Sequence, residues 1–181
     1  PRPPFKAALR TRHALRLSSQ HVRMWWASAV LAIKSMPLHA NLIGWHPGLS
    51  SEKFTWPTCV AERPHGAGLV VSEAWSHQLR LFDVCGRESG TIGAAGRAPG
   101  QFIFPSSVAV ERPSGCMYVV DSGNHRLQKL DRDGAPLDVV GSAGMGDGQL
   151  MSPKAITCAA ERVIVSDAGA HRLSVFDREL R

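Results

Sequence analysis

Three histidines recur along the sequence at nearly constant spacing, and histidine is a common metal ligand and proton carrier. His77 and His125 are 48 residues apart, and His171 follows after another 46. An acidic residue precedes each histidine by four positions, as Asp121 and Asp167 do. Neutral imidazoles around one ion, with a position left open for water, would make a catalytic zinc site. Two carboxylates could instead divide the acid and base roles of a reaction between them.

The same spacing extends far beyond these residues, which favours a structural role for them. Residues 100–102 (Gly-Gln-Phe) return 48 positions later as residues 148–150 (Gly-Gln-Leu). Side chains that recur with a repeat unit are most simply explained by the fold. Acids in matching surroundings also lack the difference in environment that a division into acid and base requires. The residues predicted to be structural are Asp121, Asp167, His77, His125, His171, Pro57, Pro105 and Pro153.

No other motif in the sequence indicates a specific reaction. Residues 141–146 superficially resemble a dinucleotide-binding loop, but a proline and a strand follow where the pyrophosphate would need a helix. The chain has no Gly-x-Ser-x-Gly motif, and its four cysteines are scattered without a Cys-x-x-Cys pair. We therefore predict no catalytic residue, no metal and no cofactor. Unpaired thiols favour a cytoplasmic location, while organelle targeting and secretion stay open.

Each repeat unit has the pattern of four short strands. In the second unit, a first strand after Pro105 is followed by a Pro/Gly turn and by a β-branched run that ends at Asp121. Residues 126–131 alternate with a period of two, and residues 137–140 make a fourth strand. Four strands in 40 to 50 residues are typical of a β-propeller blade. We predict an all-β partial propeller of three blades, at residues 54–93, 102–141 and 150–181, the last without its fourth strand.

The second unit resembles the NHL repeat. The resemblance is carried by Gly-x-x-Gly at residues 93–96, Gly-Gln-Phe at 100–102 and Tyr-Val-Val-Asp-Ser-Gly-Asn-His-Arg-Leu-Gln at 118–128. It weakens in the first unit, where residues 73–78 read Glu-Ala-Trp-Ser-His-Gln, and the third unit lacks the asparagine. The resemblance implies a six-bladed propeller, of which three blades are half. We therefore expect further blades in a longer parent chain, or pairing with a second copy.

Residues 1–40 form a basic segment that does not fit the repeat, and residues 41–181 form the NHL-like region. Residues 1–51 carry seven Lys and Arg and no acid, whereas residues 52–181 carry 14 Lys and Arg against 15 Asp and Glu. The basic pI therefore gives the repeat region no nucleic-acid signature. Four interpretations of the segment stay open: a poorly ordered tail, a decayed blade, a transit peptide, or a secretory signal beginning at Met24. No apolar run is long enough for a membrane-spanning helix.

The loops on one face of the predicted propeller are the candidate binding surface, because loops carry function on a rigid scaffold. RNA binding would need phosphate-neutralising cations and stacking aromatics, and the loops offer only Trp75 and Phe102 as aromatics. We therefore rank a protein partner above RNA. The candidate binding residues are Arg97, Gln101, Asn124, Arg126, Gln149, Lys154 and Arg172.

The preferred function is a non-catalytic β-propeller module that binds another protein through these loops. One alternative is the substrate- or RNA-recruiting domain of a tripartite-motif-type ubiquitin ligase, whose NHL domains resemble this region. A second alternative is a metal-dependent propeller lyase or hydrolase, since propeller lyases similar to NHL proteins use a histidine-bound zinc in the central channel. The sequence itself supplies no distinctive ligand set for that metal.

Overall fold

The computed structural model describes residues 54–159 and 161–181. All of them belong to the unit Leu38–Arg181. The predictions made for residues 1–40 therefore lie outside the described residues. No helix in the described part is long and apolar enough to cross a bilayer.

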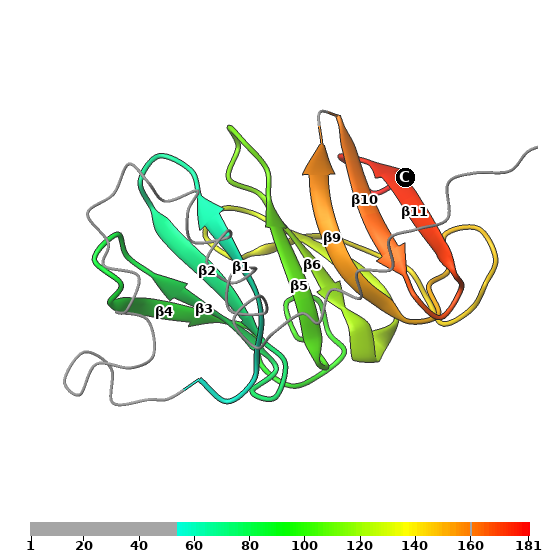
Figure 1. Ribbon diagram of the computed structural model, residues 1–181, viewed down its shortest axis with the longest axis horizontal. Helices are drawn as coiled ribbons and strands as arrows, with labels where there is room; N and C mark the ends of the chain where they lie inside the picture. Colours follow the sequence, from blue (N-terminus) through cyan, green and yellow to red (C-terminus); the bar gives the residue numbers. More distant parts are fainter. Residues whose placement is uncertain (1–53, 160) are drawn as a thin grey trace, which may run out of the picture. The chain divides into compact units, whose positions relative to one another are not determined.

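The described residues form three antiparallel sheets that lie side by side (Figure 1). The first two sheets have four strands in the order of the sequence, and the third has three. We refer to the three sheets as blades 1, 2 and 3. Their strands are β1 (Pro57–Arg63), β2 (Gly68–Glu73), β3 (Gln78–Phe82) and β4 (Glu88–Ile92); β5 (Pro105–Val110), β6 (Met117–Asp121), β7 (Arg126–Leu130) and β8 (Pro136–Val140); and β9 (Pro153–Ala159), β10 (Arg162–Asp167) and β11 (Arg172–Asp177).

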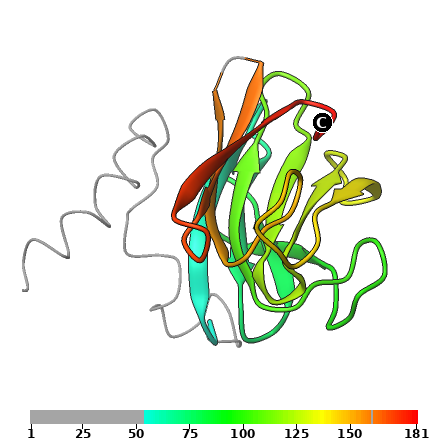
Figure 2. The same ribbon diagram turned by 90° about the vertical axis from the view of Figure 1, so that its right-hand side faces the viewer.

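The innermost strand of each blade begins at the repeated proline. Pro57, Pro105 and Pro153 are the first residues of β1, β5 and β9, a position where the missing N–H costs no ladder hydrogen bond. These three strands are neighbours in space (Figure 2). The second strands β2 and β6 are buried along their whole length. Residues 69–71 of β2 and 117–120 of β6 are continuous apolar runs, because each strand is covered on both faces.

The hydrophobic cores lie between blades. Between blades 1 and 2, Val70 and Leu79 pack with Phe102, Val108 and Met117, together with other apolar residues of both blades. A second cluster between blades 2 and 3 consists of Tyr118, Val120, Leu127, Leu150, Ile156, Val163, Val165, Phe176 and Leu180. Successive blades therefore hold one another through apolar side chains on their facing surfaces, as in a propeller. The prediction of an all-β partial propeller is confirmed.

The outward face of blade 3 is open. Leu79 and Leu127, at matching positions of β3 and β7, are fully buried by the blade that follows each of them. Leu173, the equivalent residue of β11, is 68% exposed, and its neighbour Val175 is 55% exposed. These two side chains form an exposed apolar surface on the third strand of blade 3.

Candidate binding face

Asp121 joins the turn after β6 to the segment that leads into its own blade. The carboxylate is fully buried and accepts hydrogen bonds from the Ile103 N–H at 2.7 Å and from Arg126 Nε at 2.7 Å. Asn124 Nδ2 donates to the same carboxylate at 2.8 Å and to the Gly96 carbonyl at 3.0 Å. An amide of the preceding loop and the arginine of the same blade therefore both bind this carboxylate.

Asp167 has the same place in blade 3. It accepts from the amides of Met151 at 3.0 Å and Ser152 at 2.8 Å. Desolvation disfavours the charged carboxylate, but the backbone hydrogen bonds from Ser152, Met151 and Ala170 and the nearby charge of Arg172 outweigh it. The pKa of Asp167 is therefore lowered from its usual value. Both repeat aspartates serve as buried hydrogen-bond centres of the loop structure.

Each repeat histidine ends the turn between the second and third strands in the left-handed conformation. The φ angles of His77, His125 and His171 are 58°, 54° and 51°. His77 Nδ1 accepts a hydrogen bond from the Phe104 N–H at 3.0 Å and so connects blade 1 to blade 2. His125 Nδ1 is buried without such a bond in the described part of the chain, because the matching amide of Ser152 donates to the carboxylate of its own blade.

Metal-ligating side chains do not gather in the described residues. Within residues 54–159 and 161–181, no group of three or more His, Cys, Asp or Glu is placed to hold an ion. All four cysteines are free, and Cys85 is the exposed one. Desolvation, followed by the charge of Glu111, raises the pKa of Cys158 to about 11, so its thiol stays protonated at neutral pH. The Cys158 side chain is half-buried and packs against the core between blades 2 and 3.

Two of the predicted binding arginines are occupied within the propeller. The Arg126 guanidinium donates to the carbonyls of Arg97 at 2.6 Å and Gln101 at 2.9 Å. Arg172 donates in the same way to Met145 at 2.7 Å and Gln149 at 2.7 Å. Each arginine therefore fixes the position of the glycine-rich loop that leads into its own blade.

Asn124 donates to Asp121 and Gly96 as described above, and the other four predicted binding residues divide into two groups. Gln101 Oε1 accepts from the Ala98 N–H at 3.2 Å, and Gln149 Oε1 accepts from the Gly146 N–H at 2.9 Å, so both close local turns. Arg97 and Lys154 are exposed, and their side chains have no ion pair or hydrogen bond within the described range. The binding role of all seven residues stays a prediction, and these two have the most accessible charges among them.

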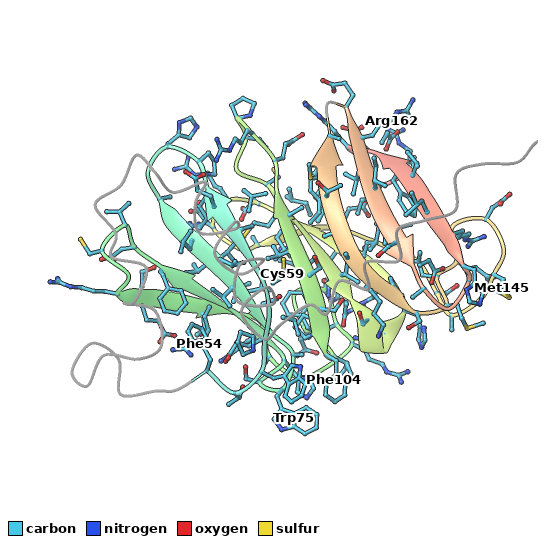
Figure 3. The ribbon with its side chains drawn as sticks, viewed as in Figure 1. Phe54, Cys59, Trp75, Phe104, Met145 and Arg162 are labelled. Atoms are coloured by element: carbon cyan, nitrogen blue, oxygen red, sulfur yellow. The ribbon has the colours of Figure 1, made fainter. Side chains whose placement is uncertain are left out.

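An exposed cluster of aromatic rings lies where the loops of blades 1 and 2 meet. The rings of Trp56 and Trp75 are 6.3 Å apart, and those of Trp75 and Phe104 are 5.5 Å apart. His77 packs edge-on against Phe104 at 4.7 Å. The exposed fractions are 62% for Trp56, 65% for Trp75 and 40% for Phe104. Figure 3 shows Trp75 and Phe104 together at one edge of the molecule. We call Trp56, Trp75 and Phe104 the aromatic patch.

The sequence reasoning chose the wrong phenylalanine for this face. Phe102 is fully buried and belongs to the core between blades 1 and 2, so it is not available for stacking. Phe104 is the exposed ring, and its position in the repeat could have identified it. Trp56 directly precedes Pro57, and Phe104 directly precedes Pro105, so these two aromatic residues occupy equivalent positions.

No protein-family model and no curated protein match the sequence. Several solved structures are similar to it in three dimensions. A hydrazine synthase from Kuenenia stuttgartiensis has a TM-score of 0.53, is 18% identical and is covered over 36% of its length by 75% of this chain.

Two further structures give similar values. In a nidogen/laminin complex the TM-score is 0.53 and the identity 16%, with 71% of this chain covering 46% of that one. For a putative exported protein from Bacteroides fragilis the values are 0.54 and 16%, with 77% of this chain covering 39%. The chain thus spans less than half of these proteins. At such identities the similarity establishes the fold, and the described residues form part of a β-propeller.

Proposed function

We propose that this chain is a non-catalytic module of the NHL-repeat type that binds a protein partner through the loops of one propeller face. The observation that carries the proposal is the aromatic patch, in which Trp56 and Trp75 are each more than half exposed. Tryptophan and other aromatic residues are enriched at protein interfaces, and they dominate binding energies there. The strands beneath supply a rigid support for the loops.

The structural roles of the titratable groups support a module without catalysis. Asp121 and Asp167 both accept hydrogen bonds from the loop that precedes their blades, and Asp121 also accepts one from Asn124 of its own turn. The repeat histidines lie at the ends of turns, where the backbone adopts the left-handed conformation. The raised pKa of Cys158 is the opposite of what a nucleophilic thiol needs.

The distribution of charge favours protein over RNA as the partner. RNA binding requires several cations that neutralise phosphates. Arg126 and Arg172 donate to backbone carbonyls of the propeller itself, and each forms an ion pair with the repeat aspartate of its own blade. The nidogen/laminin complex is a solved case in which a protein similar to this chain occurs with another protein.

The open face of blade 3 is proposed to receive a further blade of the same repeat. Leu173 matches Leu79 and Leu127, through which blades 1 and 2 pack against their successors, and Val175 matches Leu81 of blade 1. A longer parent chain would supply this blade within the same molecule, and a second copy would supply it between molecules.

The proposed function is tested with the purified full chain and a matched pair of variants. Trp75→Gly removes the central ring of the patch, whereas Leu137→Ser removes an exposed apolar side chain elsewhere, which is 56% exposed on β8. All three proteins are probed against an array of peptides of varied composition and against single-stranded RNA oligonucleotides. We expect peptides to bind the native chain and the Leu137 variant but not the Trp75 variant. Retention of RNA alone, or of no probe, would contradict the proposal.

A further inference from the structure

The central ring of the aromatic patch stands where the repeat otherwise requires glycine. A Cβ atom at Gly123 would lie 2.7 Å from the Ile103 carbonyl oxygen, and one at Gly169 would lie 2.7 Å from the Met151 side chain. Both distances are too short, so glycine is needed at this turn in blades 2 and 3. The equivalent residue in blade 1 is Trp75, whose large side chain is mostly exposed. A departure from the structural rule that leaves a large ring exposed is the pattern expected at a functional site.

The backbone of Phe104 has an unusual conformation. Its φ angle is 50°, in the left-handed region that bulky residues rarely adopt. The hydrogen bond from its N–H to His77 Nδ1 fixes this geometry, and the His77 ring packs against the Phe104 ring. Blade 3 has Ser152 at the matching position, so the aromatic side chain is not a requirement of the fold. Strained residues of this kind concentrate at binding sites.

The three segments that form the patch, residues 54–57, 74–77 and 102–105, contain no Lys, Arg, Asp or Glu. The Glu73 carboxylate beside them is buried and accepts hydrogen bonds from the Thr55 N–H and the Ser76 hydroxyl. A ligand with phosphates or carboxylates would find no counter-charge in these segments. The indole N–H groups of Trp56 and Trp75 have no hydrogen-bond acceptor in the part of the chain that the structure describes. The fitting ligand is therefore apolar and offers free carbonyl oxygens.

We propose that the aromatic patch binds a proline-rich peptide in the polyproline II conformation. This conformation has three residues per turn and rises about 3.1 Å per residue, so prolines three apart return to the same face after about 9 Å. Neighbouring rings 6.3 and 5.5 Å apart form one continuous aromatic surface for such a face, like the aromatic-lined sites that bind proline-rich segments. The conformation also leaves every backbone carbonyl free to accept from an indole N–H, and it is ordered before binding. The inference rests on the proposed function and names the chemical class of its partner.

The test measures binding of fluorescein-labelled octaproline to the purified full chain by fluorescence anisotropy. Two variants restore the residues that the repeat uses elsewhere: Trp75→Gly, as in blades 2 and 3, and Phe104→Ser, as in blade 3. Because the fold already accepts these residues at matching positions, both variants should stay folded, which circular dichroism checks. We expect saturable binding to the native chain, a dissociation constant raised about tenfold or more in each variant, and no change in Leu137→Ser.

A second set of probes separates this inference from the proposed function. Labelled peptides of equal length, one of alternating Gly and Ser and one of alternating Leu and Gln, and a uridine octanucleotide are titrated in parallel. Binding of the Leu-Gln peptide alone, lost in Trp75→Gly, would overturn the proline-rich class and leave protein binding intact. Binding of the oligonucleotide alone, or of none of the probes, would overturn both. Octaproline binding that survives both patch variants would also overturn the inference.

Discussion

Equivalent leucines in the three blades offer a direct measurement of which blade faces are covered in solution. Leu79, Leu127 and Leu173 occupy the same position of the third strand, but their exposed fractions are 0%, 0% and 68%. Truncating a fully buried leucine to alanine costs about 2–5 kcal/mol, from lost burial and from the cavity that remains. A side chain that is two-thirds exposed keeps about a third of its burial energy and leaves no cavity. We therefore expect Leu127→Ala to lower the free energy of unfolding by about 2–5 kcal/mol, and Leu173→Ala by about 1 kcal/mol or less.

The assay is urea unfolding of the full chain and the three alanine variants, followed by circular dichroism at several protein concentrations. Leu79→Ala is a second test of the same effect as Leu127→Ala, because both residues are fully buried between blades. The reasoning would be refuted if Leu173→Ala cost as much as the other two at every concentration. A cost for Leu173→Ala that grows with protein concentration would instead show that a second copy covers this face.

Three further predictions concern the loops and the thiols. Gly123→Ala should destabilise the chain by about 1–3 kcal/mol in thermal or urea unfolding, because the added methyl would lie 2.4 Å from the Ile103 side chain. The pKa of Asp167 is lowered in the fold, so its stabilisation is present above the pKa of an unfolded aspartate and is lost as the pH falls through the lower, folded value. Asp167→Asn should therefore weaken the acid dependence of unfolding, and an unchanged pH profile would contradict this. Iodoacetamide at pH 8 should modify the exposed Cys85 well before Cys158, as peptide mass spectrometry would reveal, because the pKa of Cys158 is raised to about 11.

The fold could be predicted from the sequence because the repeat is marked by residues that have the same backbone position in every blade. Pro57, Pro105 and Pro153 mark the first residue of each inner strand. Strands β2, β6 and β10 follow the β-branched runs that end in an acid. A position-by-position match over three copies carries more information than the propensity of one strand, since chance patterns do not recur in register.

The binding face was less accessible, because the sequence does not show which polar groups are used internally. Arg126 and Arg172 looked available, but each meets backbone carbonyls of a loop about 25 residues earlier in the chain. Phe102 and Phe104 are separated by one residue, and only the packing of blade 1 against blade 2 decides that Phe102 enters the core. Comparison of the aligned repeat positions would have exposed the departure at Trp75, because glycine occupies the matching turn of the other two blades.

The most direct test of the central claim is ¹⁹F NMR of the full chain labelled with 5-fluorotryptophan. The chain has five tryptophans, of which Trp56 and Trp75 belong to the aromatic patch. The single variants Trp56→Phe and Trp75→Phe assign the resonances of these two residues. On titration with octaproline we predict that these two resonances shift together with one dissociation constant, while the other three stay in place. Saturable binding that shifts the other tryptophans and leaves Trp56 and Trp75 unmoved would contradict the account.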